Sequence, residues 1–510
     1  MKYQRQLFVV SILILTFLAP STSAKRVLFM PFPITSHASV QVDIGRSLVE
    51  RGHEVCLVFP DSVTRKGVLN TTGMSVIEYH TAFNVEDDII LDLMLKPFLA
   101  REAISMDTMV TRFWNLSHEI LSNGSLFEQI RAVQADLFVF DDDMGVARMM
   151  AVFAYRLGVP FAGVDYNFKG FSRRVAFSPA SVPAPMTGFG PRMTLSERVK
   201  NTLMWFLTLI YDPLEIPDVV SRYAAEMTPT SLDRLVARAE VWLIQSDPVL
   251  NFPYPTLPNI KFIGGLAASP SKPLDSRFRT FMDSAKDGVI VVSFGSMVAN
   301  LHKNITDTLM AAFMEMSPVK VVVRTKVTSP DPTQVMTSSW LPQNSLLAHR
   351  NCRVFVTHCG INGVYQALYH GVPMLGLPLF FDQEDNAHIL ELKGFGVSMD
   401  IREVKVQDLV NAIRKLIQDP HYKQSITKAS TLFRDLYGVP VTSAAYWLDH
   451  VMKYGGDYMR SSGQEMPLYQ FLLLDVLGIL AGSLGVLLVL LCCCLRWVGK
   501  RFFKAKAKVD

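Results

Sequence analysis

The stretch that most constrains the fold of this chain lies between residues 340 and 386. Its residues 353–357, RVFVT, are apolar and mostly β-branched, which is typical of a short buried strand. The small-residue segment HCGING comes next, and then VYQALYHG, which has helical length and ends at a glycine. A Gly-Val-Pro break separates this helix from a second apolar run, MLGLPL, and from the polar cluster FFDQEDN. The pattern predicts strand, turn, helix and strand, as in a parallel α/β sheet.

The start of the predicted helix is suited to bind a phosphate group. Gly360, Asn362 and Gly363 lie there, and a helix start presents backbone N–H groups and the positive end of the helix dipole. Small residues let a phosphate come close to the backbone. His358 lies at the end of the strand, on the sheet edge where α/β proteins bind ligands.

This stretch resembles the signature of the UDP-glycosyltransferase family, most closely its membrane-bound animal branch of UDP-glucuronosyltransferases. The resemblance extends over nearly the whole chain of 510 residues. It implies an inverting enzyme that transfers a hexosyl group to the hydroxyl of a small lipophilic acceptor. The favoured group is glucuronosyl, with UDP-glucuronate as the donor. A UDP-glucose user and a non-catalytic binding or partner subunit are the alternatives.

The resemblance also implies a UDP-sugar site. Trp340 offers a flat face to the uracil ring and Gln343 an amide to its edge. Asp382 and Gln383 resemble the pair that binds the sugar hydroxyls. The implied donor-site residues together are Ser296, Trp340, Gln343, His358, Gly360, Asn362, Gly363, Gln366, Asp382 and Gln383. The UDP-sugar is a co-substrate, so no cofactor is expected, and no metal-ligand spacing is present.

Two positions in the motif depart from the family pattern. Gln366 stands where a glutamate usually accepts hydrogen bonds from the ribose, and it keeps an acceptor oxygen but loses the charge. Cys359 stands where a glycine is usual and would add a side chain beside the phosphate site. These changes motivate the non-catalytic alternative.

Transfer to a hydroxyl also needs a base, and His37 is the candidate. It is expected in the loop after the first strand, and an ordinary histidine pKa of about 6.5 suits proton transfer near neutral pH. A carboxylate would orient its imidazole, and Asp141 matches the partner aspartate of the family, although Asp142 and Asp143 leave the register open. Adjacent strand residues point to opposite faces, so Asp141 and Asp142 are a poor glycosidase pair.

Alternating strands and helices on both sides of a Pro- and Gly-rich linker, residues 252–274, predict two doubly wound halves. With the resemblance, the fold class is α/β of the GT-B type, two Rossmann-like domains facing a cleft. The expected domains are an acceptor domain at 25–265 and a UDP-sugar domain at 266–455. The apolar segment 201–211 is too short to span a bilayer. We expect it to be part of the core, and a pocket wall or a membrane-surface contact is the alternative.

Both ends of the chain indicate the secretory pathway. Residues 1–24 have the basic start, short apolar core and small-residue exit of a signal peptide. Residues 472–495 have the length of a transmembrane helix, and the basic tail 496–510 predicts a cytosolic end. The last residues, KAKVD, resemble an endoplasmic reticulum retrieval signal.

The expected topology is therefore a single-pass type I protein of the endoplasmic reticulum membrane with lumenal domains. Sequons for N-glycosylation begin at Asn70, Asn115, Asn123 and Asn304. A net charge of +4 does not indicate a nucleic-acid partner. The expected partners are the UDP-sugar, a lipophilic acceptor and membrane lipid, with a homo- or hetero-oligomer of related transferases left open.

Overall fold

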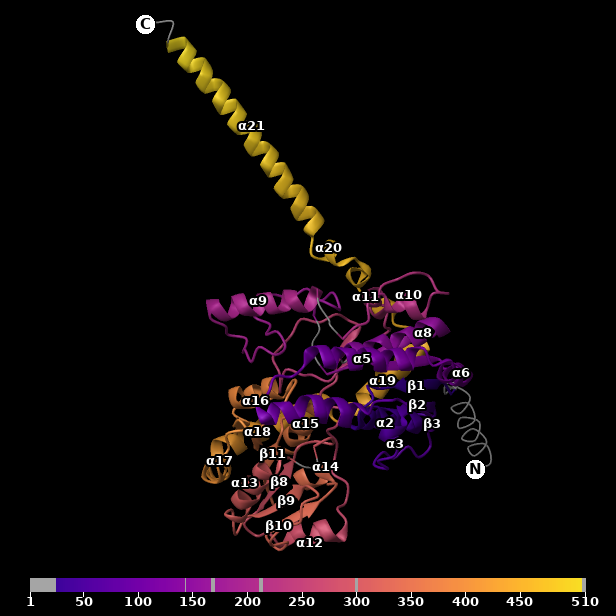
Figure 1. Ribbon diagram of the computed structural model, residues 1–510, viewed down its shortest axis with the longest axis vertical. Helices are drawn as coiled ribbons and strands as arrows, with labels where there is room; N and C mark the ends of the chain where they lie inside the picture. The colour runs from indigo at the N-terminus through magenta and orange to yellow at the C-terminus, as the bar shows by residue number, and fades with distance from the viewer. Residues whose placement is uncertain (1–23, 143, 167–169, 211–213, 299–300, 507–510) are drawn as a thin grey trace, which may run out of the picture.

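The computed structural model describes residues 24–142, 144–166, 170–210, 214–298 and 301–506. The expected signal peptide, except Ala24, the residue Asp143 and the last four residues of the retrieval signal lie outside the described part. The described chain folds into two lobes, each built on one parallel sheet, with a long helix projecting from one end (Figure 1).

The sheet of the N-terminal lobe has the strand order β3-β2-β1-β4-β5-β6-β7, and all its pairings are parallel. Its strands are β1 (Arg26–Met30), β2 (Glu54–Pro60), β3 (Ser75–Tyr79), β4 (Leu137–Asp141), β5 (Phe161–Asp165), β6 (Trp242–Ile244) and β7 (Ile260–Phe262). The central strands are buried, as their apolar runs predict. The linker prediction was wrong in part, since β7 lies inside residues 252–274 and completes this sheet.

The C-terminal lobe has the order β10-β9-β8-β11-β12-β13, again parallel. Its strands are β8 (Val289–Ser293), β9 (Lys320–Arg324), β10 (Val335–Ser338), β11 (Cys352–Thr357), β12 (Met374–Gly376) and β13 (Gly396–Ser398). The run MLGLPL is a strand only in its first half, and the rest of it leads towards the cleft between the lobes.

Helices connect the strands on both faces of each sheet. Those of the N-terminal lobe are α2 (Thr35–Glu50), α3 (Asp61–Thr64), η1 (Val85–Leu95), α4 (Lys96–Ala100), α5 (Met106–Leu121), α6 (Gly124–Val133), α7 (Met144–Met149), α8 (Ala151–Leu157), α9 (Leu195–Ile210), α10 (Val219–Tyr223) and α11 (Leu232–Val236). The C-terminal lobe and the tail contain α12 (Ser276–Ser284), α13 (Lys303–Met314), α14 (Gln343–Leu347), α15 (Ile361–His370), α16 (Gln383–Leu392), α17 (Val406–Gln418), α18 (Pro420–Tyr437), α19 (Pro440–Tyr454), η2 (Asp457–Met459), η3 (Ser462–Glu465), α20 (Leu468–Phe471) and α21 (Leu474–Lys506).

Helix α19 returns to the N-terminal lobe. Ala444 and Leu448 belong to the buried cluster that also contains Ile44 of α2 and Phe29 of β1. His53 of the N-terminal lobe also hydrogen-bonds Asp449 at 3.1 Å. The last part of the expected UDP-sugar domain therefore packs on the first lobe and ties the two together.

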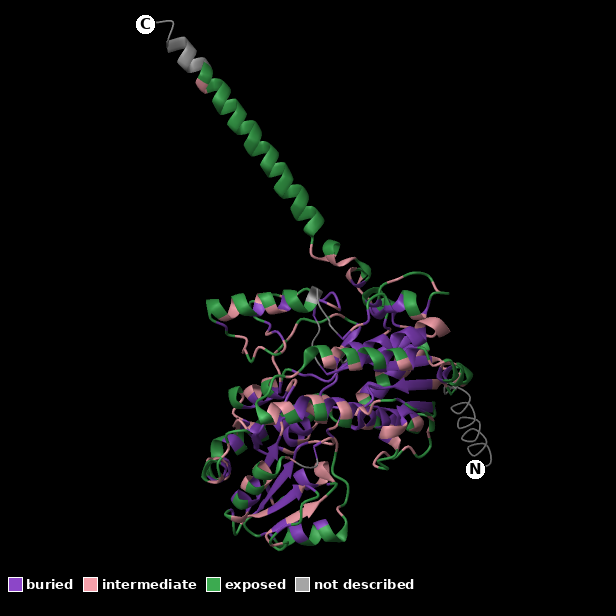
Figure 2. Cartoon of the chain, viewed as in Figure 1, coloured by how far each residue is buried: buried purple, intermediate pink, exposed green. Residues whose placement is uncertain are grey.

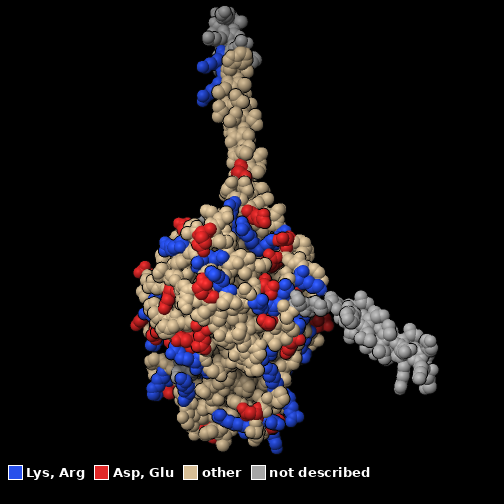
Figure 3. Space-filling model, turned by 90° about the vertical axis from the view of Figure 1, so that its right-hand side faces the viewer, with Lys and Arg blue, Asp and Glu red and all other residues tan. Residues whose placement is uncertain are grey.

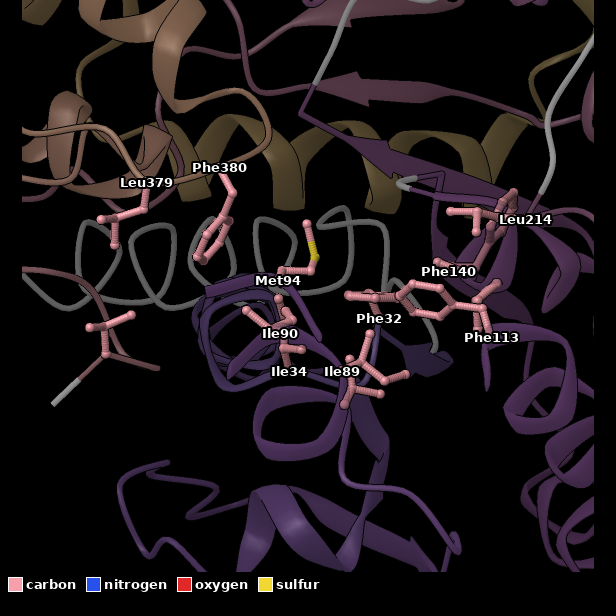
Figure 4. Packing of buried hydrophobic residues seen from close by; sticks show 14 of the residues in the cluster. Phe32, Ile34, Ile89, Ile90, Met94, Phe113, Phe140, Leu214, Leu379 and Phe380 are labelled. Carbon is pink, nitrogen blue, oxygen red and sulfur yellow. The ribbon is translucent and has the colours of Figure 1, made fainter. Parts of the chain in front are cut away.

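The two lobes also share apolar packing at the cleft. Figure 4 shows Phe380 of the C-terminal lobe extending towards the segment that carries Ile90 and Met94 of η1. All three are buried members of one cluster. The lobes therefore meet in an apolar contact beside the site described below.

Helix α21 projects from the body, and nearly all its residues whose burial is described are exposed (Figures 1 and 2). Its segment Leu474–Lys500 is long and apolar enough to cross a membrane, and none of its most apolar window is buried. Figure 3 shows a projecting helix with an acidic residue near its foot, a long uncharged middle and basic residues near its far end, in contrast to the mixed charges of the body. The helix begins two residues later than the expected 472–495 and continues past its end.

Candidate active site

A cleft of about 1470 Å³ lies between the lobes. All the donor-site residues predicted from the sequence line it, as does His37 from the other lobe. Its N-terminal wall is largely apolar, with Phe32, Ile34, Ile90, Met109 and Phe171 among the lining side chains. Sequence reasoning did not find this wall, because its residues come from segments without a common motif.

His37 and Asp141 form a buried pair. The His37 Nδ1 atom lies 2.9 Å from Asp141 Oδ2, and Asp141 has no exposed surface. The same carboxylate accepts from the Phe32 backbone N–H at 2.7 Å and from the Gln41 side-chain amide. A carboxylate so placed only accepts, so Nδ1 carries the hydrogen and Nε2 is the basic nitrogen of the neutral ring.

The position of His37 differs from the expected loop. Helix α2 starts at Thr35, with Ile34 in an extended N-cap conformation, so His37 lies in the first helical turn. Gln41 follows one turn later on the same face and therefore reaches the same carboxylate. The helix, rather than a loop, orients the imidazole.

Asp142 has a different set of partners. It pairs with Arg173 at 2.7 Å and with Arg148 at 3.3 Å, and all three side chains are buried. Asp165 completes the network through Arg173. Alternation along the strand end sends Asp141 towards His37 and Asp142 towards these arginines.

The start of α15 forms the opposite side of the cleft. Gly360 is its N-cap, and a Cβ atom there would lie 2.4 Å from His358 Nε2. A Cβ atom at Gly295 would lie 2.7 Å from the same nitrogen. Both glycines therefore make room for the imidazole and leave the backbone open to the cleft.

Two polar atoms near this helix start, Ser296 Oγ in the loop after β8 and His358 Nδ1, are buried and receive no hydrogen bond from the described residues. The His358 ring itself is held by a hydrogen bond to the backbone of Ser293. Burial and the charge of Arg324 lower the pKa of His358 to about 4, so its ring is neutral at physiological pH. The unpartnered Ser296 hydroxyl is a donor close to a helix N-terminus, a combination that is suited to an anionic oxygen.

Arg324 holds the loop after β8 in place beside the start of α15, and its role was not predicted from the sequence. Its guanidinium donates to the carbonyl of Ser296 at 3.0 Å and to that of Gly295, and it lies 5.3 Å from the centre of the Trp340 ring. The signal was present, since Arg324 ends a buried strand at the same sheet edge as His358. Trp340 itself is 44% exposed and lines the cleft.

Gln343 and Gln366 are bonded to each other. Gln343 Nε2 donates to Gln366 Oε1 at 2.7 Å, and Gln366 Nε2 donates to the Ala267 carbonyl at 3.2 Å. Both amides are thereby oriented. The acceptor oxygen of Gln366 is already shared with Gln343.

Asp382 and Gln383 lie at the start of α16. Gln383 Oε1 accepts from the backbone N–H groups of Leu379 and Phe380, so its amide nitrogen is the group that can donate to a ligand. Asp382 Oδ2 accepts from Asn386 at 2.6 Å. Asn362 of α15 accepts from Gln245 at 2.8 Å, a contact from the N-terminal lobe that sequence reasoning missed.

The Cys359 side chain does not face the cleft. Its side chain is fully buried, does not line the cleft and lies against Gly376, where a Cβ atom would come within 2.6 Å of the sulfur. Its φ of 65° is the left-handed conformation that favours glycine. The expected crowding beside the phosphate site is therefore wrong: the substitution strains the backbone instead.

The sequon asparagines lie at the surface to different extents. Asn70, Asn115 and Asn304 are exposed, whereas Asn123 is half-buried and caps α6 by accepting from the Leu126 N–H at 2.9 Å. Exposure permits glycosylation at the first three positions.

Comparison with solved structures supports the fold. The calicheamicin glycosyltransferase CalG4 matches 85% of this chain and 99% of its own with a TM-score of 0.59 at 15% identity. The glycotransferase of kitacinnamycin matches 84% of this chain and 98% of its own with a TM-score of 0.56 at 19% identity. The predicted GT-B fold is confirmed.

Comparison with protein families and curated proteins covers almost the whole sequence. The family model described as "UDP-glucoronosyl and UDP-glucosyl transferase" matches residues 25–509. UDP-glucuronosyltransferase 2B17 of Mus musculus is 31% identical over 96% of this chain and 96% of its own. UDP-glucuronosyltransferase 2B10 of Homo sapiens is 32% identical over 89% of each chain. The chain belongs to the family of UDP-glucuronosyl and UDP-glucosyl transferases.

Proposed function

We propose that this protein transfers glucuronosyl from UDP-glucuronate to a hydroxyl group of small lipophilic acceptors, with inversion at the anomeric carbon. The observation that carries the proposal is the His37–Asp141 pair, at 2.9 Å, facing the cleft that the start of α15 closes from the other side. The names of the similar curated proteins support glucuronate as the sugar.

The chemistry follows from the two walls of the cleft. His37 Nε2 takes the proton of the acceptor hydroxyl, and the oxygen attacks the anomeric carbon as the bond from that carbon to the phosphate oxygen breaks. UDP leaves with the bonding electrons. The N–H groups at the start of α15, with Ser296 and His358, stabilise its diphosphate. Asp141 holds the imidazole tautomer and stabilises the imidazolium.

The remaining donor contacts follow from the side chains that line the cleft. Trp340 stacks on the uracil and Gln343 binds its edge, while Gln366 faces the ribose. Asp382 and Gln383 bind the sugar hydroxyls. The apolar wall around Phe32, Ile34 and Met109 suits a lipophilic acceptor. This set of groups does not call for a metal ion, so chelators should leave the rate unchanged.

We also place the lobes in the lumen of the endoplasmic reticulum. The basic residues after the apolar segment of α21 support a cytosolic end by the positive-inside rule. Exposed sequons at Asn70, Asn115 and Asn304 agree with this orientation. A glycosidase-sensitive mass shift that disappears in the triple Asn→Gln variant tests it, and an unshifted wild type would contradict it.

A donor screen tests the function. Membranes that contain the full chain are supplied with a phenolic acceptor and UDP-glucuronate, UDP-glucose or UDP-xylose in turn. The proposal predicts transfer from UDP-glucuronate at the highest kcat/KM. Transfer only from another UDP-sugar would overturn the choice of sugar, and no transfer from any of them would overturn the enzymatic function.

A further inference from the structure

Gln245 is a fully buried amide that connects the two lobes beside the start of α15. It directly follows the last residue of β6, and its backbone N–H donates to the Asp165 carbonyl of β5 at 2.8 Å. From this sheet edge its side chain extends to Asn362 in the first turn of α15, with Nε2 2.8 Å from Asn362 Oδ1. A residue of the acceptor lobe is thereby bonded to a residue of the donor site.

The direction of both amides in this pair is fixed by one backbone group. The Leu266 N–H, in the segment that connects the lobes, can only donate, and its nitrogen lies 3.1 Å from Gln245 Oε1. The Gln245 atom that faces Leu266 is therefore the oxygen, so its NH2 group must face Asn362. Because an NH2 group only donates, the Asn362 atom that receives it is the side-chain oxygen.

The NH2 group of Asn362 is the polar end of this pair that is left to the cleft. Asn362 lines the cleft and Gln245 does not. Among the described residues, none accepts a hydrogen bond from Asn362 Nδ2, while Oδ1 is turned to a fully buried partner. A directed donor in the first turn of α15 adds to the backbone N–H groups that this helix start offers to an anion.

The segment that connects the lobes keeps Leu266 in place. Gly265 lies so close to α15 that a Cβ atom there would be 2.0 Å from Cγ of Tyr365. The Gly264 N–H donates to the Ser246 carbonyl of the N-terminal lobe at 3.3 Å. The segment is thus attached to one lobe and pressed against the other, which holds the Leu266 N–H within reach of Gln245.

We propose that Gln245 is a positioning residue of the donor site, which holds the Asn362 amide with its NH2 group towards the UDP diphosphate. The inference deepens the proposed function and rests on it, since it takes the diphosphate to lie at the start of α15. An asparagine without this partner is free to present its oxygen instead, and that oxygen would repel the phosphate oxygens. The acceptor lobe thereby contributes to UDP affinity without touching UDP.

A change of one group in Gln245 tests the orientation. Gln245→Glu keeps the length of the side chain and an oxygen for the Leu266 N–H. Its other oxygen accepts when the carboxyl is ionised and donates when it is protonated. The ionised form should therefore turn the Asn362 amide round, whereas the protonated form should keep the wild-type direction. Burial favours the protonated form at slightly acidic pH.

The affinity of the full chain for UDP is measured by calorimetry at about pH 6 and about pH 9, on either side of the range expected for a buried glutamic acid. Each variant is compared with the wild type at the same pH. This ratio removes the titration of UDP itself and of groups that all the proteins share, such as Asp247, His358 and Lys393.

Gln245→Glu should bind UDP within about twofold of the wild type at the lower pH and at least about tenfold more weakly at the higher pH. Gln245→Met removes both hydrogen bonds and should weaken UDP binding about fivefold at both pH values. The matched control is Gln334→Glu, since Gln334 is a half-buried amide outside the cleft that donates to the Val319 carbonyl at 2.7 Å. It should follow the wild type.

Wild-type affinity in Gln245→Met would overturn the proposal, and so would a deficit of Gln245→Glu that is equal at the two pH values. A role in folding alone would give no such pH dependence relative to the wild type. Gln245→Met decides by itself if the glutamate variant does not fold. Absence of UDP binding by the wild type would be a different result, since it would overturn the proposed function together with this inference.

Discussion

At the residue scale, the geometry of one carboxylate determines how His37 can act. Asp141 accepts hydrogen bonds from the His37 ring, the Phe32 N–H and the Gln41 amide, and these three bonds fix its orientation. Asp142, one residue later, is held by Arg148 and Arg173. The sequence left the choice among three aspartates open because all three have the same chemistry, and only the direction of the side chain distinguishes them.

Replacement of Asp141 tests this assignment. Asp141→Asn should lower kcat by about 10²- to 10⁴-fold, because the amide no longer stabilises the imidazolium. The KM for the UDP-sugar should change little, since Asp141 does not line the cleft. Steady-state kinetics of Asp141→Asn separate the two parameters. A loss confined to KM would show that Asp141 only shapes the donor site.

The two departures from the family motif should behave differently. Gln366→Glu restores a charged acceptor and should tighten UDP binding about fivefold, as charge-assisted hydrogen bonds are the stronger kind. Cys359→Gly should leave UDP affinity unchanged, because the sulfur is buried against Gly376. Calorimetric titration of both variants with UDP measures the two affinities. Tighter binding by Cys359→Gly would mean that this side chain does reach the phosphate site.

At the element scale, the turn from β11 into α15 depends on the absence of side chains. The strand, the helix and its glycine C-cap were all predicted from residues 353–371, because strand, helix and cap signals agree there. Arg324 and Gln245 were not, although both follow the same rule of a polar residue at the end of a buried strand. Both positions lie outside the motif of residues 340–386, so this general rule is the only signal that the sequence holds for them.

Adding one methyl group at this turn tests its role. Gly360→Ala places a carbon 2.4 Å from His358 Nε2 and must displace the imidazole, so UDP binding should weaken by about tenfold or more. Gly124→Ala is the matched control, since a Cβ atom there meets nothing within 4 Å. Titration with UDP gives both affinities. Equal binding by the two variants would contradict a phosphate site at this helix start.

At the scale of the whole molecule, the fold was more predictable than the way its parts combine. Apolar runs and helical periods are local signals, so the two parallel sheets and the terminal helix were found. The placement of β7 in the first sheet depends on a contact between segments far apart in sequence. The core prediction for 201–211 is wrong for one side of α9, where Leu203, Phe206 and Leu207 are exposed, because the segment is apolar on both sides and only the fold shows which side is covered.

Two half-buried histidines should make the stability of the fold depend on pH. The pKa values of His358 and His370 are lowered to about 4 by burial and by Arg324 and Arg434 respectively. Between about pH 6.5 and pH 4 the unfolded chain binds these protons and the folded chain does not, so stability falls as the pH falls through this window and is unaffected above it.

His370 lies outside the proposed donor site and isolates this effect. His370→Gln keeps a donor to Asn344, which His370 contacts at 3.0 Å. The loss of unfolding free energy between pH 7 and pH 5 should be about 2 kcal/mol smaller in this variant. Urea unfolding in detergent at the two pH values measures it. An identical pH dependence in the two proteins would show that His370 titrates normally.

The central claim is that a UDP diphosphate at the start of α15 faces the imidazole of His37 across one cleft. Its most direct test is His37→Ala, assayed on one sample for UDP affinity by calorimetry and for glucuronosyl transfer in a single turnover. The account predicts unchanged UDP affinity and transfer slower by about 10²-fold or more. Transfer at the wild-type rate by a variant that binds UDP normally would contradict it.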